Sequence, residues 1–326
     1  VCPRFSSGDG KGLIKSSIRG DDLFILCDVG NYSCTYNYFG RENSMSPDDH
    51  YQDLKRIIQA AGGKAHRINI IMPSLYGGRQ HRRNYRESLD CAVALQELQS
   101  MGVSNILTFD AHDPRVQNAV PLMGLDNIIP SYQVLKAMFK NLSDFRPDKD
   151  HFMIISPDEG AINRNMYYAS VLGVNLGMFY KRRDYSTIID GRNPIVAHEY
   201  MGNDVAGKDV FIADDIISSG ESMLDIAVEL KKRKANKIYC YATYPIFTNG
   251  LESFNKAYAD GIIDGVFGTN LTYRTPELLS SPWFYEVDCS KYIAYFIASL
   301  NHDKSISQVI DPHTKIEALL KKYGIK

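Results

Sequence analysis

The sequence lacks the marks of several protein classes. Its six cysteines are scattered and form no Cys-x-x-Cys pair, so neither a zinc site nor a disulfide framework is expected in a chain this long. No apolar run approaches the roughly 18 residues that span a bilayer. The opening VCPRFSSGDG has no charged-then-apolar signal pattern. We therefore expect a cytoplasmic protein that does not enter a membrane.

An excess of charge of one sign is also missing. The 37 basic and 38 acidic residues leave a formal net charge of -1. No overall field therefore attracts nucleic acid or an anionic membrane surface. We expect no nucleic-acid partner, although a local basic site stays open.

The composition is typical of a soluble globular protein, with 44% hydrophobic and 23% charged residues. A chain of 326 residues can bury one large core or two ordinary ones, and we expect two domains. The chain opens on Val1 rather than on methionine, so we expect a trimmed start.

Short, almost continuous apolar runs alternate with helical patterns along the chain. Such runs are typical of strands that are buried on both faces of a sheet. They cover residues 23–27, 68–72, 105–109, 152–156, 176–180, 209–213 and 238–243. Between the last two, residues 220–234 carry apolar side chains at i, i+3, i+4 and i+7 from Met223, which predicts a helix. The alternation predicts an α/β fold with mostly parallel sheets and ligands at the carboxyl ends of the strands.

The polar stretch NLSDFRPDKD, residues 141–150, contains Pro147 and few apolar residues. Such a stretch favours a hinge between two halves. We place the domains at residues 1–145 and 146–326, and we expect the last helix to pack back on the first domain.

The stretch FIADDIISSGES, residues 211–222, runs from a predicted strand into two adjacent carboxylates, Asp214 and Asp215, and then into a hydroxyl-rich turn. Carboxylate oxygens could hold sugar hydroxyls or a metal ion, whereas the N–H groups and hydroxyls at a helix start attract an anion. The combination predicts a site for a sugar phosphate. The alternative is a segment that only ends a strand and caps a helix, and Glu221 counts against phosphate unless its side chain points away.

Arginines follow another predicted strand, in MPSLYGGRQHRR, residues 72–83. Arg79, Gln80 and the arginines after them could bind polyphosphate or a stacked purine, because a guanidinium group is flat and bonds bidentately. A solvated basic loop explains the run equally well.

Candidate ligand-binding residues follow three further predicted strands. His112 emerges after residues 105–109, where a lone histidine is more often a packing residue than a ligand. Asp158 could hold Mg²⁺ together with nucleotide phosphates, since that ion prefers a few carboxylates plus phosphate oxygens. Lys181 and Arg183 follow residues 176–180 and, as an isolated basic run, would more often form a solvated face.

Taken in order, these motifs resemble those of the ribose-phosphate pyrophosphokinase family. The 211–222 stretch is similar to the phosphoribosyl pyrophosphate loop that this family shares with type I phosphoribosyltransferases. RFSSGDG at 4–10 and HDKSIS at 302–307 extend the resemblance over nearly the whole chain. His81 replaces the family's usual acidic residue, and DPR at 113–115 replaces its small residues. Residues 31–50 and 245–261 look longer than in the family.

The resemblance implies two similar domains of the type I phosphoribosyltransferase-like kind, each with a central, mostly parallel sheet flanked by helices. It also implies Mg²⁺ as cofactor. The implied catalytic residues are Lys181 and Arg183, and the implied metal residues are His112 and Asp158. ATP would meet Arg79, Gln80 and His112, and a neighbouring subunit would contribute Ser7 and Asp9. Ribose 5-phosphate would meet Asp214, Asp215, Ser218, Ser219, Gly220, Glu221 and Ser222.

The activity that the resemblance implies is transfer of the β,γ-diphosphoryl group of ATP to the anomeric hydroxyl of ribose 5-phosphate. The products are 5-phosphoribosyl 1-diphosphate and AMP. The loop after Tyr180, residues 181–194, is expected to close over the substrates. A homo-oligomer of dimer units is expected, and hexamers are common in the family. Two alternatives stay open: a phosphoribosyltransferase that uses the same diphosphate, and a catalytically silent regulatory homologue.

Overall fold

The computed structural model describes residues 1–83, 85–183 and 195–325, and of residues 181–183, 195–198, 308 and 309 it describes the backbone only. The chain forms two compact units. The first unit comprises Val1–Pro130, Leu271–Tyr273 and Cys289–Ile310. The second comprises Ser131–Asn270, Arg274–Asp288 and Asp311–Lys326.

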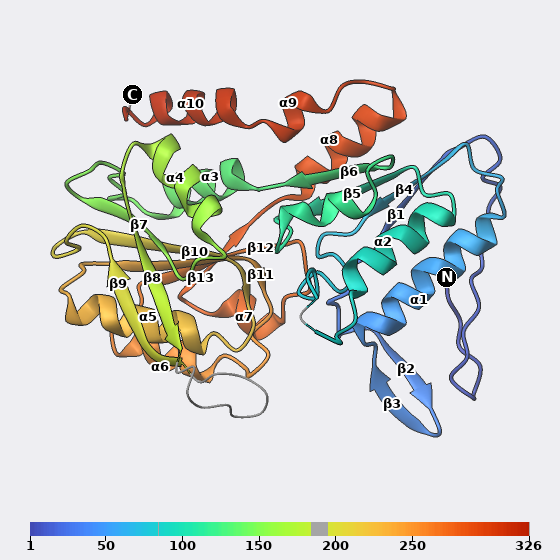
Figure 1. Cartoon of the computed structure of the whole chain (residues 1–326), viewed down its shortest axis with the longest axis horizontal. Coiled ribbons are helices and arrows are strands. Elements are labelled where there is room, and N and C mark those ends of the chain that lie inside the picture. Colours follow the sequence, from blue (N-terminus) through green and yellow to red (C-terminus); the bar gives the residue numbers. More distant parts are fainter. Residues whose placement is uncertain (84, 184–194, 326) are drawn as a thin grey trace. The chain divides into compact units, whose positions relative to one another are not determined.

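The first unit is built on a four-stranded parallel sheet (Figure 1). Its strands, in spatial order, are β1 (Asp22–Leu26), β4 (Arg67–Ile71), β5 (Asn105–Phe109) and β6 (Gly124–Ile128). The register sets Ile25, Ile70 and Ile106 side by side across the sheet. This apolar row belongs to the first unit's core.

Two helices cover that face, α1 (Pro47–Ala61) and α2 (Asp90–Ser100). α1 begins at Ser46 with a reciprocal capping box, because the Ser46 hydroxyl and the Asp49 carboxylate each accept the other residue's backbone N–H. The Tyr51 hydroxyl on α1 donates to the Ala94 carbonyl on α2 at 3.0 Å. The helices are therefore joined to each other as well as to the sheet.

The first unit also contains a two-stranded antiparallel hairpin, β2 (Thr35–Tyr38) and β3 (Arg41–Ser44), within the segment that looked long in sequence. Its remaining elements are the 3-10 helix η1 (Pro114–Ala119), α8 (Ser290–Asn301) and α9 (Ser307–Ile310).

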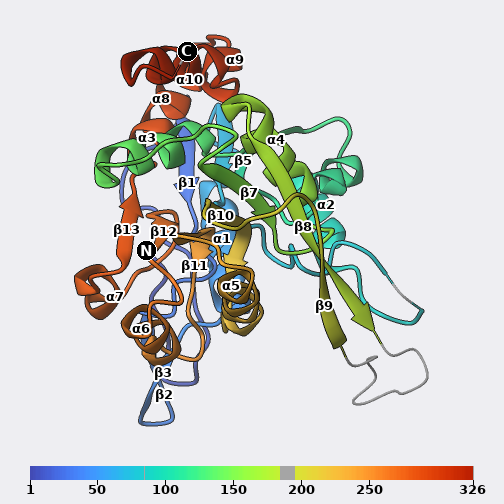
Figure 2. The same ribbon diagram turned by 90° about the vertical axis from the view of Figure 1, so that its left-hand side faces the viewer.

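The second unit is built on a seven-stranded sheet in which all paired strands are parallel except the last pair. In spatial order its strands are β13 (Phe284–Val287), β12 (Gly265–Thr269), β11 (Ile238–Pro245), β10 (Asp209–Ile217), β7 (Phe152–Ser156), β8 (Asn175–Arg183) and β9 (Ile195–Met201). In Figure 2 the antiparallel pair β8–β9 extends as a long ribbon. The order turns back between β7 and β10, and open α/β sheets bind ligands at such a reversal.

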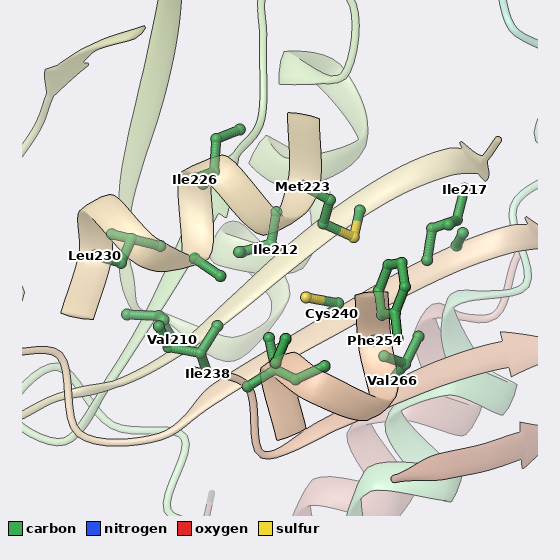
Figure 3. Close-up of a cluster of buried hydrophobic side chains, with 14 of the residues drawn as sticks. Val210, Ile212, Ile217, Met223, Ile226, Leu230, Ile238, Cys240, Phe254 and Val266 are labelled. Atoms are coloured by element: carbon green, nitrogen blue, oxygen red, sulfur yellow. The ribbon is translucent and has the colours of Figure 1, made fainter. Parts of the chain in front are cut away.

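Helices cover both faces of this sheet. On one face, α5 (Glu221–Lys232) and α6 (Glu252–Ala259) bury Ile226, Leu230 and Phe254 against the strands (Figure 3). On the other, Tyr168 of α4 (Ile162–Leu172) meets Phe211 with ring centroids 5.7 Å apart. The unit's other helices are α3 (Ser131–Asn141), α7 (Pro276–Ser280) and α10 (His313–Lys322).

The expected α/β class is confirmed, and each of the seven predicted strands corresponds to an observed one. The predicted helix at 220–234 is α5. Strands β6, β9, β12 and β13 and the β2–β3 hairpin were not predicted. No helix among the described residues is long and apolar enough to cross a membrane.

The polar stretch at 141–150 belongs to the second unit. Phe145 packs between Phe139 and Phe152, and Asp144 pairs with Lys237 at 2.5 Å. The compact units are assembled from several segments, so the sequence boundary between residues 145 and 146 stays a prediction. The packing expected of the last helix also stays a prediction, although α10 lies in the second unit and is followed by Tyr323, which stacks on Phe139 at 4.5 Å.

α5 begins at a position that only glycine fits. Gly220 has φ 82°, a left-handed conformation that side chains rarely adopt. A β-carbon there would also lie 2.3 Å from the Phe254 ring. The start of the helix is therefore set by a close approach of backbone to the core.

We expect Gly220→Ala to lower the free energy of unfolding by about 2–6 kcal/mol, the sum of left-handed strain and overpacking. Gly207→Ala is the matched control, because Gly207 has φ 74° but no atom within 4 Å of the added carbon. It should lose only the strain, about 1–3 kcal/mol. Chemical denaturation of both variants measures the difference, and equal losses would show that the Phe254 contact is unimportant.

Candidate functional site

The site in the second unit lies where β10 extends beyond the end of β7. Pairing between these strands ends at Ile212 and Ile155, whereas β10 stays paired with β11 as far as Ile217. The sequence placed Asp214 and Asp215 after the strand, which is wrong, because both lie within β10. They fall in its final part, beyond the last residue that pairs with β7.

The two carboxylates have different surroundings. Asp215 is buried, with 6% of its surface exposed, and its backbone N–H donates to the Asp214 carboxylate at 2.8 Å. Arg164, on α4, places Nη1 3.6 Å from Asp214 Oδ1. Arg164 is itself buried, so its cation is held beside the acidic pair.

Burial and the adjacent Asp215 raise the pKa of Asp214 well above its ordinary value, and Asp158 adds to the rise. Arg164 acts in the opposite direction. Hydroxyl groups that donate hydrogen bonds to a carboxylate favour its charged form and so oppose the effect of burial. The site is therefore suited to a ligand that brings hydroxyls.

The turn after β10 leads directly into α5. Ser218, Ser219 and Gly220 are half-buried, whereas Glu221 and Ser222 are exposed. Ser218 is fixed through its carbonyl, which accepts the Thr248 N–H at 2.9 Å. Among the described residues no side chain caps the helix, and a long 3.5 Å contact joins the Glu221 N–H to the Ser219 hydroxyl. A helix start of this kind favours an anion.

Asp158 enters the same region from the end of β7. Its carboxylate accepts the Ala161 N–H at 3.2 Å, and its carbonyl accepts the Ser156 hydroxyl at 2.8 Å. Asn165 on α4 donates to the Ala213 carbonyl of β10 at 2.8 Å. The loop that carries Asp158 is therefore fastened to β7, and α4, which follows it, is fastened to β10.

The basic candidates Arg79 and Gln80 lie in the first unit, in the loop after β4. Gln80 is held by its side chain, which donates to the carbonyls of Arg82 and Ser88 at 3.2 and 2.9 Å. Arg79, Arg82 and Arg83 are exposed. The loop therefore presents cations to solvent from a fixed backbone.

His112 lies in the first unit too, after β5. Its ring is exposed, and it lies 5.3 Å from the ring of His81 in the arginine loop. Asp110 just before it is buried and has φ 44°, a left-handed value for a side chain other than glycine. Strain of this kind gathers at functional sites. The structure thus brings His112 and the arginine loop together.

Ser7 and Asp9 are exposed on a tight turn near the start of the chain. The Ser7 hydroxyl donates to the Asp9 carboxylate at 2.8 Å. Gly8, between them, has φ 92° and lies against the Tyr38 ring of the hairpin. The predicted pair is therefore adjacent in space and braced by the β2–β3 segment.

The backbones of Lys181 and Arg183 belong to β8, paired with His198 and Ile195 of β9. Residues 181–183, the start of the expected closing loop 181–194, are therefore part of a strand. The side chains of Lys181 and Arg183, and residues 184–194 of that expected loop, lie outside the described residues. Their roles stay predictions.

The predicted residues fall into two groups. Asp158, Asp214, Asp215 and the 218–222 turn share the second unit, whereas Ser7, Asp9, Arg79, Gln80 and His112 share the first. The metal pair His112 and Asp158 is divided between them and stays a prediction. In the described part of the chain, no three potential ligands gather as a metal cluster.

Sequence reasoning missed Arg164 and Asn165. Both lie on the buried face of α4, where a charged side chain needs a partner. That face could have been recognised from the helical spacing of Arg164, Asn165 and Tyr168, but not its partner Asp214.

Two α/β units, and an acidic pair followed by a hydroxyl-rich turn at a strand-order reversal, define a protein of the phosphoribosyltransferase class. Residues 125–261 match the phosphoribosyl transferase domain, and residues 1–102 match the N-terminal domain of ribose phosphate pyrophosphokinase. The chain belongs to the ribose-phosphate pyrophosphokinase family.

Individual relatives agree with this assignment. The ribose-phosphate pyrophosphokinase of Shewanella oneidensis is 28% identical over 94% of this chain and 89% of its own length. That of Vibrio cholerae is 27% identical over 94% of this chain and 90% of its own. The crystal structure of phosphoribosylpyrophosphate synthetase from Mycobacterium smegmatis has a TM-score of 0.74 and 20% identity, covering 93% of this chain and 90% of that one. That structure shows the shared fold.

The raised pKa of Asp214 predicts a stability effect that depends on pH. The folded protein binds this proton more tightly than the unfolded chain, so ionising Asp214 costs stability as pH rises from its ordinary pKa toward the folded value. Asp214→Asn should therefore raise the free energy of unfolding at neutral pH, with a gain that shrinks toward pH 4. Asp225→Asn, at an exposed position on α5, is the control and should show no such trend. Denaturation across pH tests this, and a gain that grows on acidification would contradict it.

Proposed function

We propose that this protein is a ribose-phosphate diphosphokinase, which converts ATP and ribose 5-phosphate to 5-phosphoribosyl 1-diphosphate and AMP. The observation that carries the proposal is the acidic pair and open helix start at the end of β10, in a member of the ribose-phosphate pyrophosphokinase family. Its curated relatives bear the name of that activity.

The two ends of ribose 5-phosphate bind to different kinds of protein group. The N–H groups at the start of α5 and the hydroxyls of Ser218, Ser219 and Ser222 hold the phosphate. Asp214 and Asp215 accept hydrogen bonds from the ring hydroxyls. Gly220 supplies the left-handed backbone of the turn and its close approach to the Phe254 ring. Glu221, exposed in the first turn, belongs to the same segment.

ATP binds to the residues that the resemblance assigns in the first unit, Arg79, Gln80 and His112. Ser7 and Asp9 of a neighbouring subunit complete the site, so the active form is a homo-oligomer. Its location is cytoplasmic, a proposal that agrees with six cysteines that are all free thiols.

Mg²⁺ fits the donor set of the site. The ion needs one or two carboxylates when substrate phosphates supply the other oxygens, and Asp158 with the nearby acidic pair offers these. His112 would contribute from the nucleotide side. When bound, the ion neutralises charge on the transferred diphosphoryl group.

The anomeric hydroxyl oxygen of ribose 5-phosphate bonds to the β-phosphorus of ATP, and the hydroxyl proton is released to water. The bond from that phosphorus to the oxygen bridging the α-phosphorus breaks, and AMP leaves with that electron pair. Lys181 and Arg183 stabilise the negative charge that spreads over the phosphoryl oxygens.

Purified protein should release AMP only when ATP, Mg²⁺ and ribose 5-phosphate are all present. Omitting each in turn, and separating AMP from ADP by chromatography, tests the activity. AMP formed from 5-phosphoribosyl 1-diphosphate and adenine instead would indicate a phosphoribosyltransferase. A lack of product, with tight association to an active subunit, would indicate the regulatory homologue.

Lys181→Ala and Arg183→Ala should each lower kcat by about 10³-fold or more while leaving KM within a few-fold, because cations of this kind act on transition-state charge. Arg182→Ala, between them, is the control and should lose far less. Steady-state AMP release measures all three. Wild-type turnover in either of the first two variants would remove that residue from the mechanism.

A further inference from the structure

Two loops of the first unit meet at the carboxyl end of its sheet. One follows β4 and carries the exposed arginines, and the other follows β5 and carries His112. β4 and β5 are parallel neighbours, with Ile71 beside Leu107, so both loops leave the same edge. What fixes one loop against the other decides how the arginines and His112 face a common ligand.

His81 and Asp113 make that connection. His81 Nε2 lies 3.4 Å from Asp113 Oδ2, and the His81 ring lies 5.3 Å from the ring of His112 at a tilt of 59°. Both members of the pair are largely hidden, with side-chain exposures of 14% and 11%. His81 therefore touches the second loop at two adjacent residues.

Asp113 is held in place by contacts within its own loop. Its carboxylate caps η1 by accepting the Arg115 N–H at 2.9 Å, and it also pairs with the Arg115 side chain at 2.5 Å. The hydrogen bonds from Arg115 lower the pKa of Asp113 to about 2, so the carboxylate is ionised at neutral pH. His81 thus meets a fixed negative charge rather than a mobile side chain.

His81 is confined as well. Its Nδ1 is buried and makes no hydrogen bond of ordinary geometry among the described residues. Burial lowers the pKa of His81, against the attraction of Asp113. The Gly78 backbone, in the same loop, opposes the effect of burial as Asp113 does.

We propose that His81 and Asp113 are positioning residues for the nucleotide, which hold the arginine loop in register with His112. The inference rests on the proposed function. It adds two residues that act on ATP binding without contacting the substrate themselves. Without the contact, Arg79 and His112 are still present, but the two loops that carry them are free to move apart. The affinity for ATP should therefore fall, while the rate of the chemical step changes little.

The test compares variants at residue 81 in the full-length protein. His81→Phe keeps an aromatic ring but removes the polar contact with Asp113, and it should raise KM for ATP about tenfold. KM for ribose 5-phosphate and kcat should change less than about twofold. His81→Gln retains an N–H donor and should recover part of the loss, an outcome that a purely steric role would not give.

His66→Phe is the matched control. His66 lies 3.1 Å from Asp22, so the same substitution removes a similar contact in the same unit but outside both loops. Its KM for ATP should equal that of wild type. An unchanged KM in His81→Phe, or an equal rise in His66→Phe, overturns the proposal.

Failure of the proposed function is separable from failure of this pair. If wild-type protein releases no AMP, the diphosphokinase assignment fails, and titration calorimetry with ATP then decides the pair: weaker ATP binding in His81→Phe than in wild type supports it, and equal binding overturns it. If wild type is active and His81→Phe is indistinguishable from it, only the pair is wrong.

Discussion

The early end of β7 beside β10 is the constraint on which the candidate sugar-phosphate site depends. Because β10 stays paired with β11 as far as Ile217 but with β7 only as far as Ile212, Asp214 and Asp215 occupy strand positions beyond the end of the β7 pairing. A rigid strand therefore carries the carboxylates, while the turn that follows supplies N–H groups. The reversal of strand order puts Asp158 next to both, and a loop alone would fix none of these distances as well.

The second unit holds like charges together at a cost in stability. Burial and Asp215 oppose ionisation of Asp214, and the buried Arg164 offsets only part of that effect. When burial disfavours ionisation of a carboxylate, a ligand rich in hydroxyls, or a cation, stabilises the charged form on binding. The acidic pair and the anion-attracting turn are thus complementary to opposite ends of one small molecule, which explains why two carboxylates precede an anion site.

The elements that could be predicted from the sequence are those with a local pattern of apolar residues. Apolar runs marked seven strands, most of which are buried on both faces, whereas β1 at the edge of its sheet is only partly buried. β6, with the sequence GLDNI, and β12, with two glycines, lack that pattern and become strands through pairing with neighbours. Contacts between residues far apart in the sequence could not be predicted either. Examples are Arg164 with Asp214 and His81 with Asp113. The latter two were seen only as separate departures from the family pattern, and the structure places them in contact.

The central claim is that the turn from Ser218 to Ser222 receives the phosphate of ribose 5-phosphate while Asp214 and Asp215 receive its hydroxyls. Amide hydrogen exchange measured with and without ribose 5-phosphate tests it most directly, with ribose as the comparison. The account predicts slower exchange over residues 214–222 with the phosphorylated sugar and little change with ribose. Protection that appears elsewhere and leaves this segment unchanged would contradict it.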